Sequence, residues 1–184
     1  MDMVMINDVF RKSVEFAIRK TPTPPETYVE ISKKFIDQMI AKVGDGSYAQ
    51  TMVASPRQAE GLARLWLNYY ICVHAQVAEK CGRYQEAVDV MNLIDEDQRY
   101  ISYPAGNEAY IVSLEKLGKH TEAFEAMKGA ASAGQMTPVI YDKLREHYAT
   151  LKEKPATFEA WIASLKPKHE VEKIKNKLRA EIID

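Results

Sequence analysis

The chain has 184 residues, 46% of them hydrophobic and 28% charged, a balance that excludes a disordered tail and fits one domain with a substantial core. Lysine and arginine total 25 against 26 acidic residues, and this formal net charge of −1 argues against nucleic-acid binding, which needs a clustered basic excess. No apolar run approaches the roughly 18 residues of a transmembrane helix, so membrane insertion is not expected.

The N-terminal part predicts two helices. In residues 6–17, Ile6, Val9, Phe10 and Ala17 recur at the spacing of one helix face. Residues 23–26 (TPPE) combine a threonine cap, proline at the first helical position and a capping-box glutamate, which indicates the start of a second helix that ends at residues 44–46 (GDG). The predicted buried stripe of this second helix consists of Tyr28, Ile31, Phe35, Met39 and Ile40.

The longest helix is predicted to begin at residues 55–58 (SPRQ), a second signal of a cap followed by proline. Small residues, including Cys72, Ala75 and Ala78, lie opposite its bulky stripe, so neighbours can approach it on two sides, as an inner helix requires. We expect both thiols to be reduced, because Cys72 and Cys81 stand nine residues apart on opposite faces of this helix. The bulky stripe consists of Leu62, Leu65, Trp66, Tyr69, Tyr70, Val73 and Val77.

Further helices follow to the end of the chain. Gly82 turns into a return helix, an acidic connector occupies residues 95–97, and another hairpin begins near Pro104 and closes at Gly134. Proline-containing starts at residues 137–138, 154–155 and 167 open three more helices. No segment shows the alternation of apolar and polar residues that is typical of a β-strand, so the predicted fold class is all-α.

One short sequence motif occurs twice. Residues 81–87 (CGRYQEA) and 117–123 (LGKHTEA) share the pattern x-Gly-x-x-x-Glu-Ala at an offset of 36 residues, each between two apolar-periodic segments. This doubling resembles the tetratricopeptide repeat, in divergent form. The resemblance implies stacked antiparallel helical hairpins, a right-handed α-solenoid of about nine helices, whose glycines permit the turns and whose alanines Ala87 and Ala123 permit close helix packing.

We therefore expect a single helical domain over residues 1–184. Residues 1–54 form an N-terminal helical pair with a connector, residues 55–135 form two repeat-like hairpins, and residues 136–184 form C-terminal helices.

A second resemblance concerns residues 141–165. Their pattern, with Tyr148, residues 158–161 (FEAW) and residues 164–165 (SL), is similar to helical regions that precede thioredoxin-like domains in some bacterial envelope proteins. The chain has no Cys-x-x-Cys, so no redox chemistry is assigned to it. The resemblance implies the periplasm or cell envelope if a leader has been removed, and otherwise the cytoplasm. Residues 1–10 do not read as a signal peptide, because Asp2 and Asp8 interrupt them.

No catalytic motif is evident. The four histidines, His74, His120, His147 and His169, form no zinc-binding pattern, and each is expected to be packed or solvated. No serine or cysteine lies in a nucleophile motif, so no catalytic residue, metal or cofactor is predicted. The basic run over residues 166–179 is interpreted as a solvated helix face.

The predicted function is a non-catalytic scaffold that binds a protein or a peptide, with the helical partner of a thioredoxin-like module as a special case. In stacked hairpins the first helix of each pair lines the binding side, and glutamates there favour a basic or amine-bearing ligand. The alternative is an enzyme whose site is assembled from distant helices. The predicted binding residues are Tyr69, Gln76, Glu79, Glu108, Val112 and Glu115.

Overall fold

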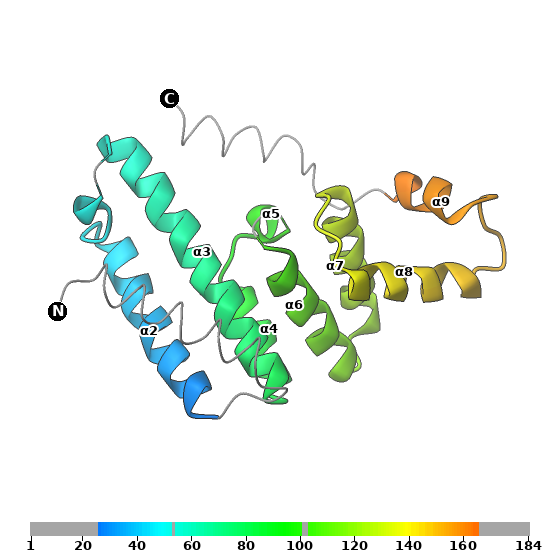
Figure 1. Cartoon of the computed structure of the whole chain (residues 1–184), viewed down its shortest axis with the longest axis horizontal. Helices are drawn as coiled ribbons and strands as arrows, with labels where there is room; N and C mark the ends of the chain where they lie inside the picture. Colours follow the sequence, from blue (N-terminus) through cyan, green and yellow to red (C-terminus); the bar gives the residue numbers. More distant parts are fainter. Residues whose placement is uncertain (1–25, 53, 101–102, 166–184) are drawn as a thin grey trace.

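The structure, a computed structural model, describes residues 26–52, 54–100 and 103–165, and in that part of the chain every regular element is helical. The helices follow one another along the long axis of the molecule, from α2 at one end to α9 at the other (Figure 1). The elements are α2 (Thr27–Gly44), η1 (Ala49–Thr51), α3 (Pro56–Lys80), α4 (Tyr84–Met91), α5 (Glu96–Arg99), α6 (Pro104–Lys116), α7 (His120–Ser132), α8 (Pro138–Thr150) and α9 (Phe158–Ser164).

The helix starts follow local sequence signals. Ser55 and Gln58 form a capping box ahead of α3, and Pro56 occupies its first turn. Thr137 caps α8 by accepting a hydrogen bond from the backbone amide of Ile140 at 3.3 Å. These contacts satisfy amide groups that have no partner inside the helix. The predicted starts of α3, α6 and α8 are confirmed.

The two copies of the repeated sequence motif form the same turn. Gly82 and Gly118 have φ of 74° and 75°. The backbone amide of each glycine donates a hydrogen bond of 2.9 Å to the carbonyl three residues earlier. The amide of the residue after each glycine donates to the carbonyl five residues before it, at 2.8 Å in the first turn and 2.9 Å in the second. This pair of bonds is the Schellman motif, which ends a helix with a left-handed residue. Ala87 and Ala123, at the start of the following helices, are both fully buried.

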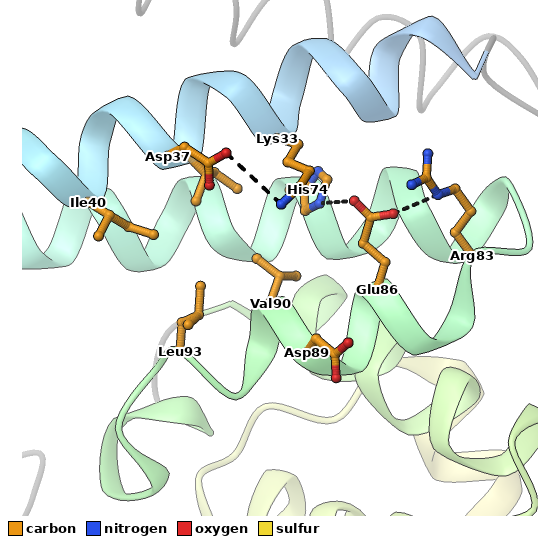
Figure 2. Close-up of a pocket in the computed structure, with 10 residues that line it drawn as sticks. Lys33, Asp37, Ile40, His74, Arg83, Glu86, Asp89, Val90 and Leu93 are labelled. Carbon is orange, nitrogen blue, oxygen red and sulfur yellow. Dashed lines mark ion pairs between the residues drawn. The ribbon is translucent and has the colours of Figure 1, made fainter.

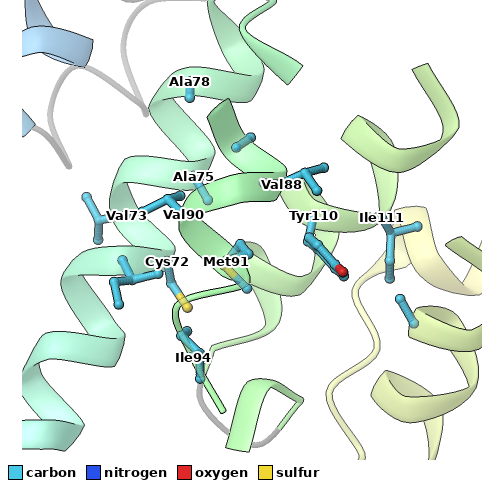
Figure 3. Packing of buried hydrophobic residues seen from close by; sticks show 14 of the residues in the cluster. Cys72, Val73, Ala75, Ala78, Val88, Val90, Met91, Ile94, Tyr110 and Ile111 are labelled. Atoms are coloured by element: carbon cyan, nitrogen blue, oxygen red, sulfur yellow. The ribbon is translucent and has the colours of Figure 1, made fainter. Parts of the chain in front are cut away.

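Helix α3 is the central element of the packing. It contacts α2, α4, α6 and η1, and α6 in turn contacts α4, α7 and α8. Side chains of α3, α4 and α6 fill the space between these helices (Figure 3). Eight of the nine residues from Tyr70 to Ala78 are buried, with Gln76 half-buried, so α3 is enclosed on nearly all sides there. This confirms the prediction of an inner helix.

The contact between α3 and α6 depends on a glycine. A Cβ atom added at Gly106 would lie 2.6 Å from both Cβ and Sγ of Cys72, closer than real side chains approach. Gly106 therefore permits the backbones of the two helices to come together. Cys72 and Cys81 are both free thiols, as predicted, with Cys72 buried and Cys81 half-buried.

Several predicted stripes differ from the observed ones. Ile31 and Ile40 are 54% and 39% exposed, because the face of α2 that meets α3 is centred on Val29, Ile36 and Met39 instead. On α3, Leu65 and Trp66 are also exposed, because they precede the segment that α4 and α6 cover.

Two boundaries also differ from the predicted ones. Residues 95–97, predicted to be an acidic connector, instead form the N-cap and the first two residues of a short helix, α5, that the sequence pattern did not indicate. Helix α9 begins after Thr157, whose side chain caps it, rather than at residues 154–155. The predicted helices over residues 6–17 and after residue 167, and the basic run over residues 166–179, lie outside the described residues.

We predict that Gly82→Ala and Gly118→Ala each lower the free energy of unfolding by about 1 kcal/mol, because alanine is strained at a positive φ. Urea denaturation measures the effect. Gly44→Ala is the matched control, since Gly44 ends α2 without a positive φ and with nothing within 4 Å of an added Cβ. Equal losses in all three variants would contradict the assignment of the two turns.

Candidate functional site

Two regions of the described structure bear on function: a cavity between α2, α3 and α4, and the surface of α3 and α6 where the sequence predicts ligand binding. The cavity measures about 490 Å³. The walls come from α2 and α4, and His74 of α3 lies between them (Figure 2). The lining residues are Lys33, Ile36, Asp37, Ile40, His74, Arg83, Glu86, Asp89, Val90 and Leu93.

His74 is held by one side chain from each neighbouring helix. Its Nδ1 lies 2.6 Å from the hydroxyl of Ser32 on α2, and its Nε2 lies 3.3 Å from Oε1 of Glu86 on α4. Nε2 carries the proton, because a bare nitrogen would face the carboxylate acceptor. The Ser32 hydroxyl, which also lies 3.0 Å from the carbonyl of Val29, then donates to Nδ1.

Burial sets the protonation state of His74. The imidazole is 1% exposed, and burial together with the positive charges of Lys33 and Arg83 lowers its pKa to about 4, against the opposing effect of Asp37 and Glu30. At neutral pH the contact with Glu86 is therefore made by a neutral ring and is not an ion pair. It is also poorly directed, since Oε1 of Glu86 is buried without a well-formed hydrogen bond.

Arg83 connects the entrance of the cavity to the start of α2. Its Nε donates to Oε2 of Glu86 at 2.6 Å, and its Nη1 donates to Oε1 of Glu30 at 2.6 Å and lies 3.8 Å from Glu26. The hydrogen bond from Arg83 lowers the pKa of the Glu30 carboxyl. Three carboxylates thus surround this guanidinium, and its charge is satisfied within the chain.

A serine, a histidine and a glutamate in line match the order of a hydrolase triad. Ser32 and His74 are 42 residues apart in sequence, so no local motif could indicate the arrangement. The Ser32 side chain is fully buried, however, and its hydroxyl reaches only His74 and Val29. No substrate can approach it in this structure, so the network ties α2, α3 and α4 together.

The six residues predicted from the repeat are all half-buried on α3 and α6. Tyr69, at the middle of α3, lies in an aromatic cluster, with its ring centroid 4.7 Å from that of Tyr103. Gln76 donates to the carbonyl of Cys72 on its own helix at 3.0 Å. No contact of Val112 bears on ligand binding, so its role stays a prediction.

The three glutamates of this set have different environments. Glu115 of α6 forms an ion pair with Lys143 of α8. Glu79 of α3 has no ion pair with a described residue, and burial raises the pKa of its carboxyl, with Glu108 of α6 acting in the same direction and Lys80 and Lys116 against it. Glu79 and Glu108 therefore lie close enough for their charges to interact, which makes this surface favourable for a cation.

No protein-family model, no curated protein and no solved structure matches this chain. Within residues 26–52, 54–100 and 103–165, no cluster of three or more histidine, cysteine or acidic side chains could hold a metal ion. None of the helices described there has the length and apolar character that a membrane crossing needs.

We predict that acidification destabilises the protein through His74. The folded state holds the ring neutral down to pH about 4, whereas the unfolded ring takes up a proton near pH 6.5. Stability is therefore complete above pH 6.5 and is lost as the pH falls from 6.5 to 4, by roughly 3 kcal/mol.

Urea midpoints at pH 7, 5.5 and 4.5, measured for the native chain and for His74→Gln, isolate this effect. The neighbouring groups Glu30, Lys33, Asp37, Arg83 and Glu86 are shared by both proteins. The loss over this range should be smaller in the variant, and parallel pH profiles would show that His74 does not cause it.

Proposed function

We propose that this protein is a helical-repeat scaffold that binds a basic or amine-bearing segment of a protein or peptide across α3 and α6. The equivalent turns at Gly82 and Gly118 support a stack of tetratricopeptide-like hairpins. So do the contacts, because α3 packs against both α4 and α6, and α6 against both α4 and α7, the order expected when one hairpin lies on the next.

The observation that carries the proposal is that two glutamates at equivalent positions of the repeated motif have different charged neighbours. Glu79 and Glu115 occupy the same place in the two copies of the repeat, 36 residues apart. Lys143 of α8 pairs with Glu115 of α6, whereas α6 brings Glu108 near Glu79 of α3. The pKa of the Glu79 carboxyl is raised by burial and also by the repulsion of Glu108, while Lys80 and Lys116 act against this. A ligand ammonium or guanidinium group between them would relieve that repulsion.

The ion pair between Lys143 and Glu115 is an example of the contact that we propose for a ligand cation. Lys143 carries an ammonium group from a separate helix, bound to a glutamate of α6, with both side chains about one quarter exposed. A lysine or arginine of a partner would make the corresponding contact at Glu79 and Glu108, and Gln76 on the preceding turn of α3 offers an amide for backbone contacts. Association with a thioredoxin-like module stays a prediction that follows from the resemblance of residues 141–165.

We predict that Glu79→Lys and Glu108→Lys each weaken partner binding at least tenfold, about 1.4 kcal/mol, because each places a cation where the ligand's cation binds. Partners recovered with the full chain are identified, and their affinity for each variant is then measured by titration calorimetry.

Glu60→Lys is the matched control, because it makes the same charge change at an exposed position near the start of α3. It should bind as the native chain does, and thermal unfolding should show all three variants folded. Unchanged affinity in both Glu79→Lys and Glu108→Lys would reject the proposed surface.

A further inference from the structure

Ahead of its buried segment, α3 carries an apolar patch formed by Leu65, Trp66 and Tyr69. Leu65 and Trp66 are 40% and 38% exposed, although both side chains are large and apolar. Tyr69, three residues after Trp66, is half-buried on the same side of the helix. Helical spacing places Glu60 and Arg64 on the opposite side of α3, so neither charge interrupts the patch. Contiguous exposed apolar side chains of this kind are typical of a contact site.

Neighbouring rings hold Trp66 in position. Its ring centroid lies 5.9 Å from that of Tyr69, at an interplanar angle of 89°, and 6.2 Å from that of Tyr70. Tyr69 in turn packs edge-on against Tyr103, the residue before α6, at 4.7 Å. A tryptophan that is fixed by other rings and still exposed loses little conformational entropy when a further side chain packs on it, and such residues contribute strongly to binding.

The apolar patch and the glutamates of the proposed binding surface lie along one face of α3. Gln76 is the one residue from Tyr70 to Ala78 that is not buried, and it lies seven residues after Tyr69, on the same face of the helix. Its amide donates to the carbonyl of Cys72 and keeps an acceptor oxygen. A ligand backbone N–H can donate to that oxygen only if it is not already paired within a helix, so this face favours an extended segment.

The length of this face determines the spacing of the ligand residues that it can bind. Glu79 follows Tyr69 by ten helical residues and Trp66 by thirteen, which correspond to about 15 Å and about 20 Å along the axis of α3. An extended chain covers these distances in about five or six residues.

We propose that the partner segment is extended and has two determinants. Its basic residue binds at Glu79 and Glu108, and an apolar or aromatic residue about five positions away packs against the apolar patch of α3. This inference rests on the proposed function and adds the second determinant of its ligand. A cation alone would bind weakly at a solvent-accessible site, because exposed ion pairs contribute little, whereas burial of an apolar side chain on a fixed aromatic ring contributes more.

Titration of the isotope-labelled full chain with synthetic peptides, followed by nuclear magnetic resonance, tests the inference. The peptides carry a lysine alone, a phenylalanine alone, or both at the proposed spacing and in either order, each in a glycine–serine background with blocked ends. The two tryptophans of the chain give two indole N–H signals, from Trp66 and from Trp161, which is 7% exposed in α9 at the other end of the molecule (Figure 1). A peptide with both residues should bind at least about threefold more tightly than the lysine peptide, and should shift the signal of Trp66 and not that of Trp161.

Three variants separate the two determinants. Trp66→Ala should lower the affinity for the peptide with both residues to that for the lysine peptide, and Glu79→Lys should weaken the binding of every peptide that contains lysine. Ile31→Ala, which truncates a 54% exposed side chain on α2, is the matched control and should change neither affinity. Thermal unfolding shows that each variant is folded.

The outcomes distinguish this inference from the proposed function. Equal affinity of the native chain for the lysine peptide and for the peptide with both residues would overturn the inference and leave the proposed function in place. Binding that depends on phenylalanine and is insensitive to Glu79→Lys would overturn the proposed function, and with it the paired arrangement. Failure of all the peptides to bind would overturn both.

Discussion

The enclosure of α3 between α2, α4 and α6 is the constraint on which the rest of the structure depends. From Tyr70 to Ala78 the helix has almost no side that reaches solvent, so its residues must be apolar, small or internally hydrogen-bonded. Cys72 faces Gly106 where any larger pair would separate the backbones, and His74 satisfies its polarity through Ser32. Every surface considered for binding is positioned by this one helix.

Local signals in the sequence predicted the fold class and most element boundaries. Capping residues with proline mark the starts of α3, α6 and α8, and glycines at positive φ mark the ends of α3 and α6, because both act through the adjacent backbone. The predicted buried stripe of α2 was partly wrong, because burial is not decided by the adjacent backbone. Helical spacing identifies a face with apolar residues, but only tertiary packing decides that Ile36 is covered and Ile31 is not.

The two candidate sites also differ in whether the sequence could predict them. The positions on α3 and α6 could be selected from the sequence, because a repeat places equivalent residues on equivalent faces. The cavity and its network could not, since Ser32, His74 and Glu86 belong to three helices and none stands in a recognisable motif. A histidine among alanines and valines on a predicted inner helix was the one available signal that a buried partner existed.

The two sides of α3 differ in their chemistry. Towards α2 and α4, the cavity combines a neutral imidazole and an arginine satisfied by glutamates with aliphatic side chains and with the charged groups of Lys33, Asp37 and Asp89. Towards α6, Glu79 is half-buried near Glu108, and no ion pair with a described residue neutralises its carboxylate, although Lys80 and Lys116 lie near enough to act on it. On that side Lys143 of α8 pairs with Glu115 but not with Glu79, so two glutamates at equivalent positions of the repeated motif differ in their partners.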